Sequence, residues 1–428
     1  MLIGIDASRA NRDRRHGPEW YSYYLIKHFA RLDKKNQYIL FCDTPLTGGL
    51  LDLSCPEMEK DCVGEIKFDK NGFQIIKSPY NNFRGRVLGW PFKFLWTQSR
   101  LSAAMLKGKI RPLDVLFIPA HTLPFIHPKK SVVTIHGVGF GRETNFYERE
   151  KMGPKSKRVQ NLTDLLVRIF TLGKYGANSY DYQAWSIKYA LKNARAIISP
   201  SEFTKSELVD IFGADEKKTR VIANGFNEKL YTTEIREERV RAVLDKYGVE
   251  KPYLFYCGKL ERKKNIPALV EAFSIMKNKH PEIKHKLVLA GNASYGYDEA
   301  VFVANEYDME QEIIMPGWVA EKELPCFYKG ADAFVFPSRY EGFGIPLLQA
   351  MGTGLPIATS NSNPIPEVVG DAGLFFDAGD IYGMADALYR IIVDEKLRKE
   401  LIAKGIERAK NYSWEKCAKE TLELIESL

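Results

Sequence analysis

Short apolar runs alternate with amphipathic stretches of helical length along most of the chain. The runs are rich in Val, Ile and Phe, and strands that are continuously apolar are typical of parallel sheets buried on both faces. Strand–helix alternation predicts right-handed βαβ units in doubly wound α/β sheets. We expect strands at Leu2–Asp6, Tyr38–Cys42, Asp114–Ile118, Val132–Ile135, Arg195–Ser199, Thr219–Ile222, Tyr253–Cys257, Lys286–Ala290, Ile313–Pro316, Asp332–Phe336 and Leu355–Ala358.

The alternation breaks between Gly225 and Pro252, where a charged stretch separates two strands. A chain of 428 residues exceeds what one hydrophobic core usually serves. We therefore predict a first domain at residues 1–230 and a second at residues 231–410. A further irregular stretch, residues 141–174, has little periodicity, and long connections of that kind are usually functional or mobile.

Charge is distributed unevenly between the two halves. Residues 1–200 contain 32 Lys and Arg against 17 Asp and Glu, whereas the remainder contains 30 against 37. A basic first half suggests an anionic partner, and the alternative is a solvated, lysine-rich surface. The six cysteines lack CxxC spacing, so we expect neither a metal cluster nor a disulfide framework. No signal peptide or long apolar span is recognisable, which favours a cytoplasmic protein.

The basic residues of the first half lie among aromatic and aliphatic residues. Residues 81–111 contain no acid, and residues 151–174 contain one, Asp164. Basic residues beside exposed apolar side chains suit an anionic membrane surface, so we predict a peripheral contact at the inner face of a membrane. The alternative is that the apolar residues are core and the bases solvate helices. The residues concerned are Arg84, Arg86, Trp90, Phe92, Lys93, Phe94, Leu95, Trp96, Arg100, Lys107, Lys109, Arg111, Leu165, Leu166, Val167, Ile169 and Phe170.

The segment Phe336–Pro346 follows a predicted strand and leads into a predicted helix at Ile345–Met351. Gly342 and Gly344 allow the backbone to approach a ligand closely, and the free N–H groups of the first helical turn favour a diphosphate or a polar sugar edge. A carboxylate at Glu341 can bind sugar hydroxyls by charge-assisted hydrogen bonds. The alternative is an ordinary strand–helix turn.

The segment Cys257–Ile266 also leaves a strand and enters a helix. Ligands of open α/β sheets bind at the carboxyl ends of strands. Cations at that edge would neutralise a pyrophosphate and stabilise it as a leaving group, although a solvated basic loop is the alternative. The bases are Lys259, Arg262, Lys263 and Lys264.

Two segments of the first half add candidate cleft residues. His136 follows a predicted strand and is expected to point into a cleft, and the alternative is a packing or turn histidine. Gly17 follows the first strand and a loop rich in arginine, and it either opens a helix against the cleft or belongs to a surface turn. The arginines of that loop are Arg9, Arg12, Arg14 and Arg15.

Together these segments resemble the retaining glycosyltransferases of family 4, which have the GT-B fold: two doubly wound Rossmann-like domains facing a central cleft. The resemblance spans nearly the whole chain and is strongest from Gly258 to Asp377. It implies that residues 1–230 are the acceptor-side domain, that residues 231–410 bind the donor, and that a helix in residues 411–428 crosses back to the first domain. The matching segments are Ile3–Ala7, Ile197–Thr204, Val221–Gly225, Pro337–Gly354 and Pro366–Gly373.

The resemblance also implies roles for single residues. The side chain of Glu341 would contact donor-sugar hydroxyls, and the amides that follow it would hold the sugar. The loop at Gly17 would close over the phosphates, and His136 would lie beside the transferred sugar. The residues implied in catalysis are His136, Lys264 and Glu341; those implied in donor binding are Gly17, Lys259 and Lys264 at the diphosphate, Trp318 and Val319 near the base, Glu341, Gly342, Phe343, Gly344 and Ile345 at the sugar, and Gln349.

Three positions depart from the family pattern. Gln349 stands where the family has a glutamate that accepts from ribose hydroxyls; an amide keeps a carbonyl acceptor but loses the charge. Lys259 replaces an arginine and retains the charge without the bidentate fork. Pro18 replaces a small or branched residue, which puts the phosphate role of the first loop in doubt.

The implied reaction transfers a hexose from a nucleoside diphosphate, UDP or GDP, to an acceptor hydroxyl with retention of configuration. The departing phosphate would take the acceptor proton. No cofactor or metal is expected, because Lys259 and Lys264 would absorb the charge and the chain has no Asp-x-Asp. The acceptor would be a glycan, a lipid-linked sugar or a small molecule, with no nucleic acid. The alternatives are a sugar-nucleotide epimerase or hydrolase, and a catalytically weak homologue that acts as a sugar-nucleotide-binding or scaffold subunit.

Overall fold

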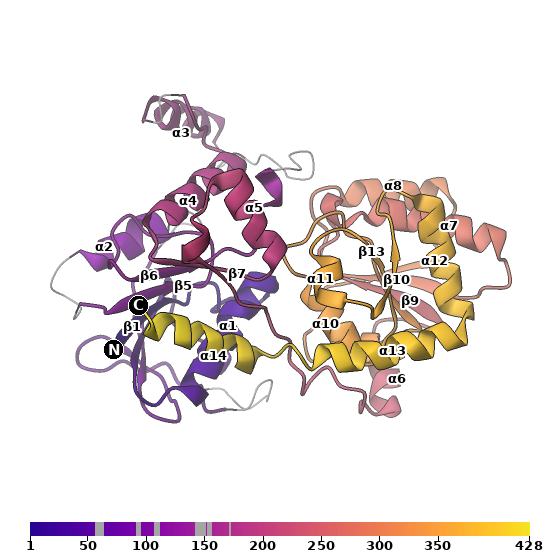
Figure 1. The fold of residues 1–428 in the computed structure, drawn as a ribbon, viewed down its shortest axis with the longest axis horizontal. Coiled ribbons are helices and arrows are strands. Elements are labelled where there is room, and N and C mark those ends of the chain that lie inside the picture. The colour runs from indigo at the N-terminus through magenta and orange to yellow at the C-terminus, as the bar shows by residue number, and fades with distance from the viewer. Residues whose placement is uncertain (56–63, 91–95, 107–111, 142–150, 152–155, 171–172) are drawn as a thin grey trace. The chain divides into compact units, whose positions relative to one another are not determined.

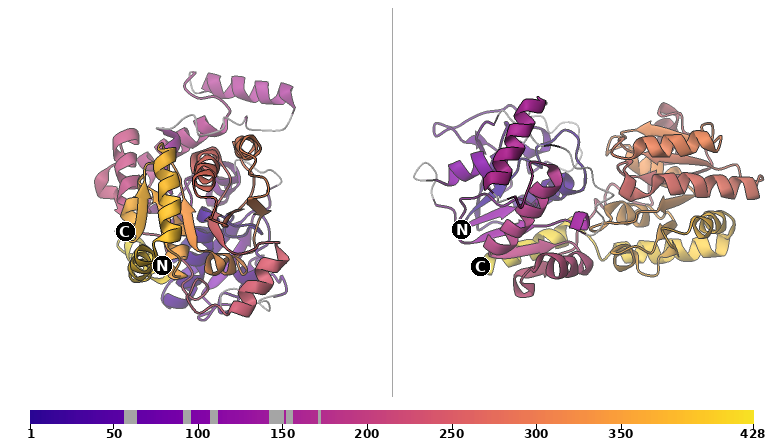
Figure 2. Two further views of the ribbon diagram at one scale, coloured as in Figure 1. Left: turned by 90° about the vertical axis from the view of Figure 1, so that its right-hand side faces the viewer. Right: turned by 90° about the horizontal axis from the view of Figure 1, so that it is seen from above.

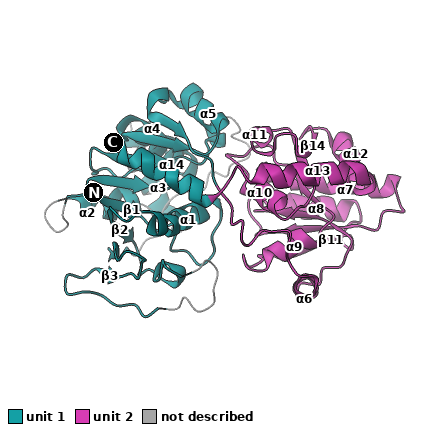
Figure 3. Ribbon diagram, turned by 60° about the horizontal axis from the view of Figure 1, so that its bottom comes forward, with its two compact units in different colours: residues 1–142, 148–224, 414–428 teal, residues 143–147, 225–413 magenta. Residues whose placement is uncertain are grey.

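The chain divides into two compact units (Figures 1 and 3). The first consists of Met1–Arg142, Glu148–Asn224 and Trp414–Leu428, and the second contains Gly225–Ser413. The predicted boundary after residue 230 lies a few residues into the second unit. The computed structural model describes residues 1–55, 64–90, 96–106, 112–141, 151, 156–170 and 173–428.

The first unit is built on a sheet of eight described strands, in the order β3-β4-β2-β1-β5-β6-β7-β8. Neighbouring strands are parallel except β3 and β4. The inner strands are fully buried because helices cover the sheet, as expected for continuously apolar strands. The strands are β1 (Leu2–Asp6), β2 (Gln37–Cys42), β3 (Gln74–Ile75), β4 (Phe83–Val87), β5 (Val115–Ile118), β6 (Ser131–Thr134), β7 (Ala196–Ser199) and β8 (Thr219–Val221).

The last helix of the chain, α14 (Trp414–Glu426), belongs to the first unit and packs on α1 (Gly17–Leu32). The ring of Trp414 stacks on Tyr24 with centroids 5.3 Å apart, and Asn36 donates a hydrogen bond of 3.0 Å to Glu426. The remaining helical segments of this unit, which Figure 2 shows from two sides, are η1 (Gly48–Leu50), η2 (Trp96–Leu101), α2 (Ser102–Met105), η3 (Gly139–Gly141), α3 (Lys157–Phe170), α4 (Ser179–Asn193), α5 (Glu202–Phe212) and η5 (Glu216–Lys218).

The second unit is a six-stranded parallel sheet in the order β11-β10-β9-β12-β13-β14. The strands are β9 (Tyr253–Cys257), β10 (Lys286–Ala290), β11 (Ile313–Gly317), β12 (Ala333–Phe336), β13 (Ile357–Ser360) and β14 (Gly373–Phe376). The helices are α6 (Glu237–Lys246), η6 (Arg262–Lys264), α7 (Ile266–Lys279), α8 (Tyr297–Glu306), α9 (Leu324–Gly330), α10 (Ile345–Gly352), α11 (Ile365–Val369), α12 (Ile381–Val393) and α13 (Glu395–Ala409).

The strands expected from apolar runs are present, most of them within a residue or two at each end. The strand expected at Leu355–Ala358 is shifted to Ile357–Ser360. Strands β3, β4 and β14 were not expected, and the stretch 141–174 contains helix α3, which its weak periodicity did not predict. Within the described residues no helix is long and apolar enough to cross a bilayer.

The cysteines differ from expectation at one position. Cys42, Cys257, Cys326 and Cys417 are free thiols. Cys55 is disulfide-bonded, which the scattered spacing of the cysteines did not predict. Its carbonyl oxygen also accepts a hydrogen bond of 2.9 Å from the buried ammonium of Lys27.

Candidate donor site and family

The two motifs of the second unit meet at one edge of its sheet. Strands β9 and β12 are parallel neighbours, with Leu254 opposite Ala333 and Phe255 opposite Phe334. The loop after β9 and the loop after β12 therefore leave the sheet side by side at its carboxyl edge, where open α/β sheets bind ligands. The basic segment and the Glu-Gly-Phe-Gly segment are thus brought together although about 80 residues separate them.

An ion pair joins the two loops. Lys264 Nζ donates to Glu341 Oε1, and both side chains are largely buried, with 13% and 10% of their surfaces exposed. The ammonium also lies 5.6 Å from the ring centroid of Phe336, the last residue of β12. A charge pair so nearly buried needs further polar partners to offset its desolvation. Hydroxyl groups of a ligand at this edge would supply such partners.

A second set of hydrogen bonds fixes the loops to each other. Asn265 adopts a left-handed conformation with φ of 60° between η6 and α7. Its side chain accepts from Arg339 Nε at 2.8 Å and donates to the carbonyl of Ala378 at 2.8 Å. The backbone N–H of Arg339 also donates to the carbonyl of Lys263 at 2.9 Å. The loops after β9, β12 and β14 therefore form one polar assembly, which holds the Lys264–Glu341 pair in place.

The helix that follows Glu341 begins at a glycine that the backbone requires. Gly344, the N-terminal cap of α10, has φ of 105°, and a Cβ there would lie 2.8 Å from Leu347 Cδ1. Pro346 occupies the first turn, where a missing N–H costs nothing. Phe343 is buried and packs edge-on against Tyr412, while Gly342 and Ile345 are partly exposed. The N–H of Leu347 donates to the carbonyl of Gly344 at 3.0 Å, and the start of this helix lies directly after Glu341, where a polar ligand can approach it.

The residues implied at the base and the ribose lie at the same edge or just beneath it. Trp318 and Val319 follow β11 directly, and Val319 is buried. Gln349 lies on α10 with 8% of its surface exposed, and its Oε1 accepts a hydrogen bond of 3.0 Å from the hydroxyl of Tyr328. The carbonyl oxygen of Gln349, which was expected to accept from ribose hydroxyls, therefore already accepts one hydrogen bond within the unit. The side-chain amide of Gln349 also carries N–H donors.

Most of the basic loop is already paired with acids. Lys263 lies 3.2 Å from Glu261, and Arg262 lies 3.0 Å from Glu299. Burial raises the pKa of Glu261, but Lys263, Lys264 and Lys259 outweigh it and leave that pKa below its ordinary value. Lys259 is exposed at the end of β9, and no described acid forms an ion pair with it. The sequence predicted a cluster of bases, and the structure distinguishes Lys259 as the one most open to an anion.

In the first unit His136 follows β6 and contacts the end of β5. Its Nε2 lies 2.9 Å from the carbonyl oxygen of Pro119, and its ring packs edge-on against Tyr21 and His121. Burial lowers the pKa of His136 to about 4, and the Pro119 carbonyl acts in the opposite direction. The imidazole is therefore neutral near pH 7 and can act as a hydrogen-bonding group rather than as a cation.

Gly17 begins α1 and is exposed, as the sequence anticipated for a loop that opens a helix. A Cβ at this position would meet nothing within 4 Å, so the surrounding structure does not require glycine. Much of the preceding arginine loop is engaged within the unit. Arg9 pairs with Glu19 at 3.2 Å, and Arg12 pairs with Asp43 at 2.8 Å. A phosphate role for this loop stays a prediction.

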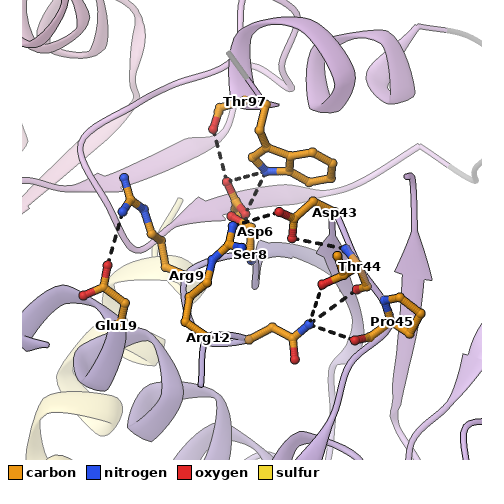
Figure 4. Close-up of polar contacts among 11 residues, drawn as sticks. Asp6, Ser8, Arg9, Arg12, Glu19, Asp43, Thr44, Pro45 and Thr97 are labelled. Carbon is orange, nitrogen blue, oxygen red and sulfur yellow. Dashed lines mark hydrogen bonds and ion pairs between the residues drawn. The ribbon is translucent and has the colours of Figure 1, made fainter. Parts of the chain in front are cut away.

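A buried carboxyl at the end of β1 was not among the expected site residues (Figure 4). Asp6 accepts hydrogen bonds from Trp96 Nε1 at 3.2 Å, from the hydroxyl of Thr97 at 3.4 Å and from the N–H of Ser8 at 3.0 Å. Burial raises the pKa of Asp6, and the hydrogen bonds from Ser8 and Trp96 oppose that rise. Its place at the carboxyl end of a predicted strand was the available signal, but two of its partners, Trp96 and Thr97, lie about 90 residues away.

The basic aromatic stretch 81–111 is only partly described, and its described members pack on the protein. Arg84 and Arg86 lie over the ring of Phe73, at 4.3 and 5.0 Å from the centroid. Trp96 donates to Asp6, and Arg100 donates to the carbonyl of Leu88. The described bases of this part thus pack on the protein, and the membrane contact of this stretch stays a prediction. Phe92, Lys93, Phe94, Leu95, Lys107, Lys109 and Arg111 lie outside the described residues.

Comparison with known proteins identifies the class. The chain matches the family model described as Glycosyltransferase Family 4 over residues 16–230 and the one described as Glycosyl transferases group 1 over residues 239–408. It is 32% identical over 260 residues to the O-antigen chain mannosyltransferase B of Escherichia coli, which covers 60% of this chain and 67% of that protein. It is 26% identical over 225 residues to the serotype-specific mannosyltransferase WbdA of Escherichia coli, which covers 52% of this chain and only 28% of that protein.

Solved structures of other proteins have a similar fold. The sucrose-phosphate synthase of Thermosynechococcus elongatus superposes with a TM-score of 0.67 at 18% identity, over 100% of this chain and 98% of that one. The chain belongs to the group 1, family 4 glycosyltransferases, and its two parallel-sheet α/β domains have the GT-B fold. The family and the fold expected from the sequence are thereby confirmed.

Proposed function

We propose that this glycosyltransferase transfers a hexose from a nucleoside diphosphate, UDP or GDP, to a hydroxyl group of an acceptor glycan, with retention of configuration. The observation that carries the proposal is the Lys264–Glu341 pair beside the N-terminus of α10. Mannose is the first hexose to test, because two relatives are named as mannosyltransferases.

Each part of the carboxyl edge of the second unit has a role in this proposal. The Glu341 carboxylate accepts hydrogen bonds from hydroxyls of the donor sugar, while Lys264 holds that carboxylate in position. The exposed ammonium of Lys259 binds the diphosphate, and the N–H groups at the start of α10 bind the sugar or phosphate oxygens. Trp318 and Val319 border the base, and Gln349 borders the ribose.

The chemistry follows from the charges at this edge. As the glycosidic bond to phosphate breaks, negative charge develops on the leaving diphosphate, and fixed cations at Lys259 and Lys264 stabilise it. The departing phosphate oxygen accepts the proton of the attacking hydroxyl on the same face of the sugar, which gives retention. The neutral imidazole of His136 lies beside the transferred sugar. The proposal requires no cofactor.

The first unit supplies the acceptor side. Its net positive charge supports an acceptor, such as a lipid-linked glycan, at an anionic membrane that the protein contacts peripherally. The cell compartment proposed for the reaction is the cytoplasm, where nucleoside diphosphate sugars are the donors.

Turnover by the purified chain tests the proposal. A panel of UDP- and GDP-hexoses, including the mannose donor, is incubated with short glycan acceptors, and product and free sugar are measured by mass spectrometry. We expect transfer from one donor, and a loss of about 100- to 1000-fold in Glu341→Ala. Glu310→Ala, an exposed acid before β11 at the opposite edge of the sheet, is the matched control.

The same assay separates the rival functions. Free sugar without transfer would indicate a hydrolase, and an isomerised nucleotide sugar would indicate an epimerase. Binding of nucleotide sugar without any turnover would indicate a scaffold subunit. Wild-type turnover by a correctly folded Glu341→Ala would overturn the proposed site.

A further inference from the structure

Helix α3 of the first unit leaves aliphatic side chains exposed, although Val167 is half-buried. Leu165, Ile169 and Val159 are 53%, 59% and 42% exposed. The half-buried positions of the helix include the polar residues Gln160, Thr163 and Asp164. A helix that packs on its own domain normally turns its apolar stripe inward. Here Leu165 and Ile169 are exposed, and the helix itself lies at the periphery of the unit (Figures 1 and 2).

The polar side of α3 is what attaches it to the unit. Asp164 accepts a hydrogen bond of 2.8 Å from the N–H of Ala177, outside the helix, and also pairs with Arg168 at 2.7 Å within the helix. A Cβ on Gly176 would lie 2.8 Å from Asp164 Oδ1, so the carboxylate approaches the backbone of Gly176 closely. Lys151 donates to Asn161 at 3.3 Å. The helix is thus held to the unit by hydrogen bonds at Asp164 and Asn161, and the aliphatic side chains of Leu165 and Ile169 remain exposed.

Charge indicates what covers the outward face. Lys157 and Arg158 are exposed in the first turn, and Arg158, Leu165 and Ile169 lie on the same side of the helix at 3.6 residues per turn. Lys174, just beyond the helix, is also exposed. Asp164 is the only acid between residues 151 and 174, and it is already paired. An amphipathic helix that combines large aliphatic residues with exposed bases is typical of binding in the plane of an anionic bilayer.

We propose that α3 is the membrane-docking element of this glycosyltransferase: Leu165 and Ile169 enter the acyl boundary while Lys157 and Arg158 bind lipid phosphates. Docking through the same face of a second copy is less favourable, because it would bring the Lys157 and Arg158 cations of two chains together. A nucleic acid would give the exposed aliphatic residues no partner.

The position of α3 relates docking to the reaction. The helix lies in the connection that runs from the end of β6, where His136 is located, to α4. Docking there would present the carboxyl edge of the first sheet to sugars carried at the lipid surface. This inference rests on the membrane contact in the proposed function. It identifies α3 as the surface that forms this contact.

Vesicle co-sedimentation of the full chain tests the inference. We expect binding to vesicles of 30% phosphatidylglycerol in phosphatidylcholine, and weaker binding as salt rises. Each base contributes about a fivefold change in partitioning, so Lys157→Gln with Arg158→Gln should bind roughly 25-fold more weakly. Leu165→Ser with Ile169→Ser should lose at least tenfold through reduced insertion.

Matched variants in the second unit serve as controls. Lys284→Gln with Lys396→Gln removes two exposed bases, and Phe302→Ser removes an apolar side chain that is 66% exposed. Neither should change vesicle binding. The α3 variants should retain transfer to a water-soluble acceptor, and Glu341→Ala should retain vesicle binding, so failure of the docking surface and failure of the donor site are distinguishable.

Two results would overturn the assignment. Vesicle binding that is unchanged in both α3 variants would move the docking surface elsewhere. A wild-type dimer that the Leu165→Ser, Ile169→Ser variant dissociates, as measured by sedimentation velocity, would show that the face is covered by a second copy.

Discussion

The carboxyl edges of the two sheets are built in different ways. In the second unit, loops from β9, β12 and β14 are joined by hydrogen bonds around Asn265 and by the Lys264–Glu341 ion pair. In the first unit, the polar groups include a buried carboxyl at Asp6 and a neutral imidazole at His136, and α3 exposes Leu165 and Ile169.

This difference matches what each edge is proposed to bind. A nucleoside diphosphate is a common ligand of many transferases, and a fixed arrangement of charges suits it. Acceptors differ from one enzyme to another, and a surface for them is made from long connections that vary without disturbing the sheet. The comparison therefore supports the proposed donor site in the second unit and the proposed acceptor side in the first.

The largest expected effect that tests this comparison is a loss of nucleoside diphosphate affinity when Lys259 and Lys264 are replaced. Replacing both with Ala should weaken nucleoside diphosphate binding by ~1.5–3 kcal/mol for each charge-assisted hydrogen bond that the substitution removes. Binding of the uncharged nucleoside should change much less, because it lacks the phosphates. Isothermal titration calorimetry with the two ligands measures the difference.

The control for this experiment is Lys284→Ala, an exposed lysine before β10 at the opposite edge of the sheet. Equal losses of affinity for the nucleoside and its diphosphate in the double variant would place the two lysines away from the phosphates and would remove the donor role from this edge.

A second prediction concerns the first unit and its response to acid. Because burial lowers the pKa of His136 to about 4, while an unfolded histidine titrates near ~6.5, the unfolded chain binds more protons between these values. The stability contributed by neutral His136 is fully present above about pH 6.5 and is lost as pH falls toward 4, a loss of roughly 3 kcal/mol at most.

Urea unfolding of wild type and His136→Gln at pH 7.5 and pH 4.5 measures this contribution. Acidification should destabilise wild type more than the variant. His280→Gln, which replaces a histidine of the second unit, should follow wild type at both pH values. Parallel losses of stability in wild type and His136→Gln would mean that the imidazole is not held neutral by burial.

The smallest expected effect concerns Tyr328, which orients Gln349. Tyr328→Phe removes one hydrogen bond and keeps the ring that packs against Phe255 and Phe334, so donor affinity should fall by ~0.5–1.5 kcal/mol. Gln349→Leu should weaken donor binding as well, whereas Gln349→Glu should be tolerated because Tyr328 can donate to a carboxylate.

Competition with 2′- and 3′-deoxy nucleotides locates the effect of Tyr328 at the ribose. If Tyr328→Phe and Gln349→Leu both bind the donor as well as wild type, the pair has a structural role and the family analogy fails at this position.

The sequence predicted much of the sheet architecture because its inner strands are continuously apolar. Strand β4 escaped prediction because Arg84 and Arg86 interrupt its apolar residues, and they are accommodated by stacking over Phe73. Strand β3 consists of only two residues, too short for a pattern. Helix α3 was not predicted although its apolar residues recur at helical spacing, because most of the surrounding stretch 141–174 has no such pattern.

The candidate site was predicted from the sequence as separate parts. Lys264 and Glu341 each lie in a recognisable strand–helix segment, but only the order of the strands, with β9 beside β12, shows that they form a pair. The hydrogen bonds from Tyr328 to Gln349 and from Trp96 to Asp6 join residues about 20 and 90 positions apart. Side-chain partners at such separations depend on packing that local patterns do not contain.

The central claim is that the carboxylate of Glu341 binds the sugar of the donor rather than its nucleotide. The direct measurement is the affinity of wild type and Glu341→Ala for the nucleotide sugar and for the corresponding nucleoside diphosphate, with Glu310→Ala as the control. The account predicts that Glu341→Ala removes the advantage of the nucleotide sugar while the affinity for the nucleoside diphosphate stays within about twofold of wild type. An unchanged advantage of the nucleotide sugar in Glu341→Ala would contradict it.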